Sequence, residues 1–186
     1  NNYAVNYANG EQIILLNNDI EIITNNWMEE MLMYSQREDV GAVGAKLYYP
    51  NDTIQHAGVI VGIKGVAGHS HQFMPRDTVG YMFRCYVPQD LSAVTAACVM
   101  MKKSVFKEVG GLDEEHFKVA FNDIDLCMKI RKAGYLVVWT PYAEAYHYES
   151  ISRGAEDTSE KQERFRGEVA AFMSKWKKEL DMGDPY

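Results

Sequence analysis

Short apolar runs alternate with amphipathic polar segments along most of the chain. The run 13–16 (Ile-Ile-Leu-Leu) ends at the polar turn Asn17-Asn18-Asp19 and predicts a buried strand whose carboxyl end carries polar groups. Asn25 and Asn26 can cap the helix that follows. The same patterns predict strands at 13–16, 40–49, 55–63, 93–101 and 136–139, an extended segment at 143–148, and helices at 27–34, 104–109, 122–133 and 158–180.

The periodicity fades between residues 65 and 89, where glycines, two histidines and two prolines predict a long loop. Loops of this length in a compact domain are more often functional or mobile than idle. Because strands alternate with helices elsewhere, we expect an α/β layered domain. Ligands of open α/β sheets bind beyond the carboxyl ends of the strands, so the turn 17–19 is the first place where we expect chemistry.

Composition narrows the class of protein. The chain has 186 residues, of which 47% are hydrophobic and 24% charged, and this excludes a disordered tail, a collagen-like fibre and a coiled coil. Its net charge of −7 disfavours a protein that binds nucleic acid through phosphate contacts. No apolar run is long enough for a membrane span. Cys85, Cys98 and Cys127 form no CxxC pair, which fits a reducing compartment and argues against a disulfide framework or a structural zinc site.

Two acidic positions are candidates for chemistry. Asp19 follows a predicted buried strand, and magnesium is commonly held by one or two carboxylates together with substrate phosphates. The alternative is that Asp19 only starts a turn. Asn122-Asp123-Ile124-Asp125 opens the clearest predicted helix, where a carboxylate can act as a general base. Helix capping would explain the same residues.

Histidine and arginine supply further candidates. His147 lies between two tyrosines and could bind Mn²⁺, although a single histidine in an aromatic strand is more often a half-buried structural residue. His69 and His71 would share one face of an extended chain, a spacing that can bind metal. Arg153 precedes a glycine and could clamp a phosphate or simply be a solvated arginine.

The order of the motifs is more specific than any one of them. Leu-Asn-Asn-Asp at 16–19 is followed by Gly-Ala-Val-Gly-Ala-Lys-Leu at 41–47, Ala-Val-Thr-Ala-Ala-Cys-Val at 93–99, Phe-Asn-Asp-Ile-Asp at 121–125, a histidine and Ser-Arg-Gly. This series resembles the family-2 glycosyltransferases of the GT-A fold over roughly residues 1–155. The resemblance implies an α/β domain with a mixed sheet and flanking helices. It also implies inverting transfer of a sugar from a nucleotide-diphosphate donor to an acceptor hydroxyl, in bacterial surface polysaccharide or glycan synthesis.

The resemblance also implies roles for individual residues. Asp19 matches the DxD-type motif, with Asn17 in place of its first acid, and His147 matches a late metal-ligand histidine, so both would bind Mn²⁺ or Mg²⁺. Asp123 matches the general base, and Asn122 replaces the usual Glu before it. The remaining implied substrate contacts are Thr95 and Ala96 on the acceptor side and Arg153 in a loop over the diphosphate.

One departure from the family pattern concerns the beginning of the chain. The family's first apolar strand and Pro-x-Tyr-Asn turn, which open the nucleotide-binding half, are absent, so we expect the acceptor-side, C-terminal part of a catalytic domain at 1–155 and a helical extension at 156–186. Alone, such a segment should bind nucleotide sugar weakly and turn over little. The signature of processive synthases is also absent.

The expected partners are a nucleotide-diphosphate sugar and a saccharide or lipid-linked acceptor, with neither nucleic acid nor a membrane span. The expected location is the cytoplasm, including the inner face of the membrane. Two other classes remain open: a non-catalytic sugar-binding module of a larger protein, and a structural α/β domain whose acidic residues only cap helices.

Overall fold

The computed structural model describes residues 1–149 and 158–186, and only the backbone of Lys64. The helices are α1 (Asn2–Tyr7), α2 (Trp27–Ser35), α3 (Lys103–Glu108), α4 (Asn122–Lys132), α5 (Ser159–Lys175) and α6 (Lys177–Met182), with 3-10 helices η1 (Ile63–Gly65) and η2 (Tyr81–Tyr86). The strands are β1 (Gln12–Leu16), β2 (Ile20–Ile22), β3 (Val40–Tyr48), β4 (Ile54–His56), β5 (Val59–Val61), β6 (Ala67–His69), β7 (Gln89–Asp90), β8 (Cys98–Lys102) and β9 (Leu136–His147).

Within the described residues, seven strands form one mixed sheet in the order β1-β8-β3-β9-β2, with β4 paired to β3 and β7 to β9. The central pair β3 and β9 is parallel, and the other pairs are antiparallel. Every residue of β3 is buried, as expected for a strand covered on both faces. The predicted α/β fold class with a mixed sheet is therefore confirmed.

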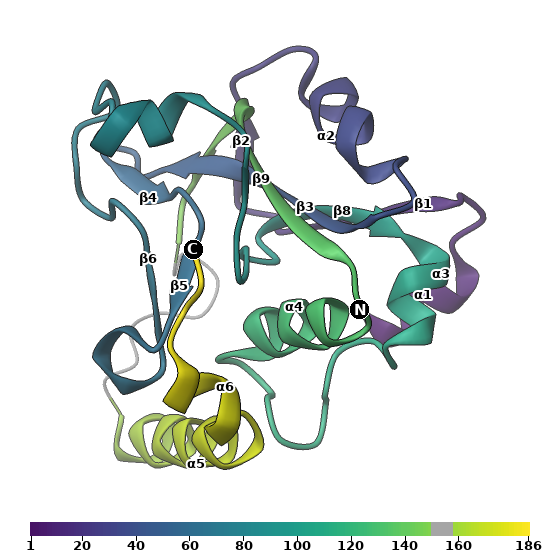
Figure 1. Ribbon diagram of the computed structural model, residues 1–186, viewed down its shortest axis with the longest axis vertical. Coiled ribbons are helices and arrows are strands. Elements are labelled where there is room, and N and C mark those ends of the chain that lie inside the picture. Colours follow the sequence, from purple (N-terminus) through teal and green to yellow (C-terminus); the bar gives the residue numbers. More distant parts are fainter. Residues whose placement is uncertain (150–157) are drawn as a thin grey trace.

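Helices cover both faces of the sheet (Figure 1). One face packs against α2 through a core that includes Met31, Val43 and Leu47, and the other packs against α4 through a core that includes Leu126, Ile130 and Trp139. A Cβ atom at position 41 would lie only 2.3 Å from Ile130 Cγ2, so α4 approaches β3 as closely as only glycine allows.

Three sequence-based strand boundaries were wrong. The strand expected at 55–63 is two strands, because the chain turns at Gly58 with φ of 92°. The strand expected at 93–101 begins only at Cys98. The segments expected at 136–139 and 143–148 form the single strand β9, in which Pro141 lies in a bulge between Gly44↔Trp139 and Lys46↔Glu144. Because proline lacks an N–H, it is tolerated in a sheet at such a bulge.

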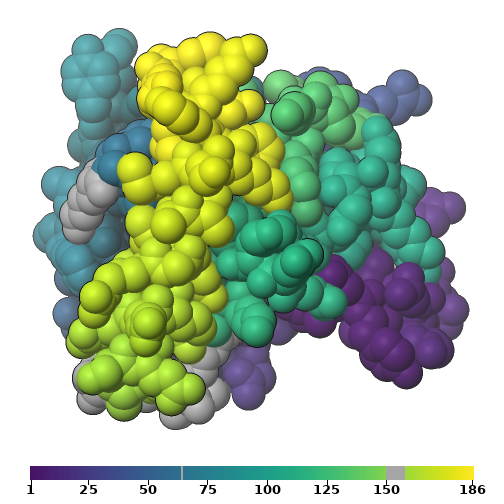
Figure 2. Space-filling view, turned by 90° about the horizontal axis from the view of Figure 1, so that it is seen from below, coloured from purple at the N-terminus to yellow at the C-terminus, as the bar shows by residue number. Residues whose placement is uncertain are grey.

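The C-terminal helices cover α4 and the segment that precedes it, as the space-filling view shows (Figure 2). Phe172 and Trp176 are buried there against Phe117. Lys175 Nζ lies 2.9 Å from Asp113 Oδ2. Burial raises the pKa of the Asp113 carboxyl, but hydrogen bonds from the backbone N–H of His116 and from Lys175 outweigh it, so the pKa lies well below its usual range. The 155/156 boundary between a domain and an extension stays a prediction.

Helix α5 also fixes the residues that lead into α4. The buried Glu168 carboxylate accepts backbone N–H groups of residues 118–120, at 3.2 Å, 3.2 Å and 2.7 Å. Phe121, the N-cap residue of α4, has φ of 63°, a left-handed conformation that is rare outside glycine. Its ring packs on Phe165 and Phe172, with centroids 5.6 Å and 5.4 Å apart. The C-terminal helix therefore holds a strained turn immediately before Asp123.

Candidate functional site

The turn after β1 lies between the start of β8 and the end of β9. Asn17 N donates to Ala97 O over 2.9 Å, and Tyr148 N donates to Asp19 O over 2.9 Å. The backbone on both sides of the Asp19 side chain is therefore tied to neighbouring strands. Asp19 occupies the carboxyl end of β1, where the sequence predicted chemistry.

Asp19 and His147 meet at this turn. Asp19 Oδ1 lies 3.2 Å from His147 Nε2, and their side chains are only 15% and 11% exposed. Asp19 Oδ1 is buried and makes no hydrogen bond. A buried carboxylate oxygen without a hydrogen-bond donor is costly unless a cation satisfies it. The structure thus brings together the two residues that the sequence proposed as metal ligands.

The hydrogen bond between Gln55 and His147 sets which ring nitrogen of His147 carries the proton. Gln55 Nε2 points toward His147 O and Glu149 Oε2, both at 3.3 Å, so its Oε1 is the atom 2.7 Å from His147 Nδ1. An oxygen at that position accepts the Nδ1–H and leaves Nε2 with its lone pair. Asn17 Nδ2 lies 3.2 Å from the same Nε2. In the neutral imidazole, Nε2 therefore accepts from Asn17 and lies 3.2 Å from the orphan oxygen of Asp19, so that two acceptor atoms face each other.

Two converging acceptors of this kind fit a divalent cation. A neutral imidazole whose other nitrogen donates to a polar partner is the usual arrangement of a ligating histidine. Among residues 1–149 and 158–186, no group of three or more His, Cys, Asp and Glu side chains could enclose a metal by itself. Asp19 and His147 would supply two protein ligands, which suits Mn²⁺ or Mg²⁺ completed by phosphate oxygens and water.

Asp123 lies in the first turn of α4, at the other side of the segment 93–97. Its Oδ2 accepts the backbone N–H of Ala96 over 3.2 Å, and its Oδ1 accepts that of Ile124 over 2.9 Å. Capping alone does not account for it, because Phe121 occupies the cap position and Asp123 also binds the segment that precedes β8. Asn122 Nδ2 donates to Val119 O over 3.1 Å, which keeps this side chain at the N-terminal edge of α4.

His56 had no predicted role, and the structure places it against Thr95, next to the residue that binds Asp123. His56 Nε2 accepts Thr95 N–H over 3.4 Å, so its Nδ1 carries the proton and donates to His69 Nδ1, 2.9 Å away. Burial lowers the pKa of His69, and the negative charge of Asp123 opposes that shift. Gln55 contacts His147, and the next residue, His56, contacts Thr95. Nothing in the spacing of these two residues distinguishes them from residues of an ordinary strand.

The predicted site residues are thus distributed around one end of the sheet. Asp19 contacts His147, and Asp123 joins them through the segment 95–97, whose Ala96 binds Asp123 and whose Ala97 binds Asn17. Thr95 and Ala96 are half-buried within that bridging segment. Arg153 lies outside the described residues, so its role stays a prediction.

The paired-histidine spacing at 69 and 71 does not form a metal site. β6 ends at His69, and His71 has φ of 57°, so the two side chains do not follow the alternation of a strand. His71 Nδ1 lies 2.6 Å from Ser70 Oγ, whereas His69 contacts His56.

The structure thus shows a mixed α/β sheet in which Asp19 and His147 meet beyond the end of β1. No family model matches the chain. It is similar to a solved mannosyltransferase, PcManGT from Pyrobaculum calidifontis in complex with GDP-Man and Mn²⁺. The TM-score is 0.56 at 15% identity, covering 91% of this chain and 41% of that one. At this identity the likeness concerns the fold alone, and it confirms the predicted GT-A type.

Three curated proteins are similar to this chain in sequence. The chain is 54% identical over its whole length to the uncharacterized protein y4gI of Sinorhizobium fredii, and spans 20% of that protein. It is 40% identical over 84% of its length to the O-antigen biosynthesis protein RfbC of Myxococcus xanthus, and spans 12% of it. It is 30% identical over 60% of its length to N-acetylglucosaminyl-diphospho-decaprenol L-rhamnosyltransferase of Mycobacterium tuberculosis, spanning 36% of it. Two of these relatives are named for O-antigen biosynthesis and for rhamnosyl transfer, and the chain spans no more than 36% of any of the three. In the described part of the chain, no helix is long and apolar enough to cross a bilayer.

Proposed function

We propose that this chain is the cation- and acceptor-binding part of an inverting, family-2 type glycosyltransferase. The donor is a nucleotide-diphosphate sugar, and the acceptor is a hydroxyl of a saccharide or of a lipid-linked saccharide in cytoplasmic polysaccharide assembly. The observation that carries the proposal is the buried, unsatisfied Asp19 Oδ1 beside the lone pair of His147 Nε2. The relatives named for O-antigen synthesis and for rhamnosyl transfer onto a decaprenol-linked sugar support the choice of substrates.

Asp19 and His147 would hold the divalent cation, with Gln55 keeping the imidazole in the ligating tautomer. When bound, such a cation neutralises the negative charge that develops on a diphosphate leaving group. By holding the cation, Asp19 and His147 would orient the donor so that its anomeric carbon faces the acceptor side of the sheet.

Asp123 would act as the general base. Its carboxylate takes the proton of the acceptor hydroxyl as that oxygen attacks the anomeric carbon. The bond from the anomeric carbon to the diphosphate breaks, and its electron pair leaves with the diphosphate. The N–H groups of Ala96 and Ile124 orient the carboxylate for this transfer. Thr95, Ala96 and Asn122 would contact the acceptor, and we assign Arg153 to the diphosphate.

The test is Mn²⁺ binding to the chain, measured by calorimetry and by the electron paramagnetic resonance of free Mn²⁺, with and without nucleoside diphosphate. We expect Asp19→Asn and His147→Gln each to weaken Mn²⁺ binding by at least about tenfold, since each removes a ligand. Asp39→Asn, which alters an exposed carboxylate paired with Arg37, is the matched control and should bind like the wild type. Equal Mn²⁺ affinity in all four proteins would contradict the proposed site.

A further inference from the structure

A pocket opens beside β3 and β9, away from the candidate cation site. Its volume is about 610 Å³, in the range of small-molecule sites. Glu144, which lines it, and His147 lie three residues apart on β9 and therefore point to opposite faces of the strand. Along the strand the two positions are separated by about 10 Å.

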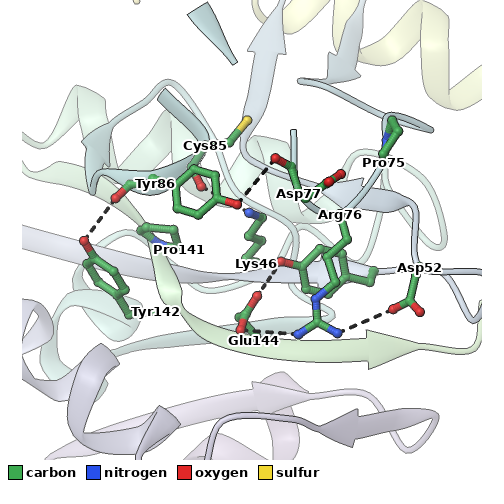
Figure 3. A pocket seen from close by; sticks show the side chains of 11 residues that line it. Lys46, Asp52, Pro75, Arg76, Asp77, Cys85, Tyr86, Pro141, Tyr142 and Glu144 are labelled. Atoms are coloured by element: carbon green, nitrogen blue, oxygen red, sulfur yellow. Dashed lines mark hydrogen bonds and ion pairs between the residues drawn. The ribbon is translucent and has the colours of Figure 1, made fainter. Parts of the chain in front are cut away.

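The pocket wall is rich in tyrosine. Tyr86 and Tyr142 are 42% and 48% exposed, and the hydroxyl of Tyr142 donates to Tyr86 O over 3.0 Å, which fixes the two residues relative to each other. Figure 3 shows these two side chains on one side of the pocket, with Pro141 beside them. Tyrosine offers a flat apolar face with a polar rim, and it orders with little loss of side-chain freedom.

Charged groups of both signs line the same pocket. Lys46, although buried, uses only one described hydrogen bond, to Cys85 O over 3.1 Å, and its ammonium lies 5.1 Å from the Tyr86 ring centroid. Arg76 lies 3.5 Å from Glu144 and 3.4 Å from Asp52. Lys46 thus has N–H donors beyond the one that Cys85 O accepts, and the carboxylates of the pocket pair with Arg76.

These features favour a neutral polyol over an ion. An anion would face Asp52, Asp77 and Glu144, and a cation would face Lys46 and Arg76. A sugar, in contrast, carries adjacent hydroxyls that can accept from an ammonium and donate to a carboxylate at once, and its C–H face can pack on a tyrosine ring.

We propose that this pocket is a binding subsite for an uncharged saccharide unit. Its use for the acceptor glycan rests on the proposed transfer function, whereas its affinity for sugar does not. The subsite would hold a sugar remote from the reacting hydroxyl, so that binding energy from a distant residue of the glycan contributes to acceptor choice.

The experiment is a titration of the ¹⁵N-labelled chain with mannotriose and a rhamnose trisaccharide, followed by nuclear magnetic resonance. Trigalacturonic acid and chitosan trimer are the anionic and cationic counterparts of similar size. We expect saturable shifts for at least one neutral trisaccharide, at backbone amides of residues around Lys46, Arg76 and Tyr142. The charged trimers should bind more weakly.

Variants then locate the contact. Tyr86→Ala combined with Tyr142→Ala should weaken the neutral sugar by about tenfold, as expected for two aromatic contacts. Both side chains are half-exposed, so the fold should persist, and the control Tyr3→Ala removes an exposed tyrosine on α1. Asp19→Asn should leave sugar affinity unchanged while Mn²⁺ binding falls, which separates this proposal from the proposed function. No binding by either neutral trisaccharide, unchanged affinity in the double variant, or tighter binding of a charged trimer would each overturn the subsite.

Discussion

Glu168 connects the C-terminal helix α5 to the segment 118–120, which leads to the proposed base. It is buried on α5, and its two oxygens accept three consecutive backbone N–H groups, those of residues 118–120. Arg164 Nε lies 3.8 Å from one of these oxygens. Replacing Glu168 by alanine leaves the three N–H groups without their acceptor and removes the negative charge next to Arg164. The segment before Phe121 and Asp123 should then loosen.

The expected loss of stability follows from these contacts. A hydrogen bond to a charged group contributes about 1.5–3 kcal/mol to stability. The net stabilisation by Glu168 is smaller than the sum of its three hydrogen bonds, because burying the carboxylate costs several kcal/mol. Water can also reach part of the exposed loop in the variant. We therefore expect Glu168→Ala to lower the free energy of unfolding by about 2–4 kcal/mol. In a chain of this size that corresponds to a decrease in Tm of roughly 5–15 °C.

Urea unfolding followed by circular dichroism, together with hydrogen exchange at residues 118–123, measures both effects. Glu168→Gln is the informative partner, because its amide NH₂ would face an N–H donor and it should lose much of the same stability. Glu163→Ala removes an exposed glutamate of the same helix and should change stability by less than about 0.5 kcal/mol. A Glu168→Ala protein as stable as Glu163→Ala, with unchanged exchange at 118–123, would refute the reasoning.

Four further outcomes are expected. Gln55→Leu should weaken Mn²⁺ binding about 10- to 100-fold in calorimetry, because His147 loses the acceptor that sets its tautomer; unchanged affinity would contradict that role. In a transferase chain that includes a nucleotide-binding half, Asp123→Asn should lower turnover by about two to four orders of magnitude, and near-normal turnover would exclude it as the base. Because the pKa of Asp113 is lower in the folded protein than the unfolded value of about 3.9, its stabilisation is complete above that pH and is lost as the pH falls through the folded pKa. Asp113→Asn should flatten the acid limb of a stability-against-pH curve, and an unaltered limb would count against the carboxylate. Burial raises the pKa of Cys127 to about 12, so this thiol should react with Ellman's reagent only after unfolding.

Local sequence patterns predicted much of the architecture because they depend on short-range physics. Apolar runs located β1 and β3, and the amphipathic stripe that ends at Gly134 located α4 within a residue of its observed end. The motif order predicted the GT-A-type fold. It also singled out Asp19 and His147, which the structure then placed in contact although 127 positions separate them.

The roles of Gln55, His56 and Glu168 were decided only by tertiary structure. Nothing in their local sequence shows that Gln55 faces an imidazole on β9, or that Glu168 binds backbone N–H groups some 50 positions earlier. The same applies to Pro141, which interrupts the local pattern yet lies in a bulge of one continuous strand.

Periodicity and capping report which face of an element is apolar and where it ends, because neighbouring residues fix those properties. Local patterns therefore predicted most of the elements, the fold class and the residue types able to bind a cation or accept a proton. Which buried polar groups meet, which tautomer a histidine adopts and which oxygen is left without a donor depend on strands and helices distant in the chain. Those features were decided by packing, since each buried polar group must find its partner across the finished fold.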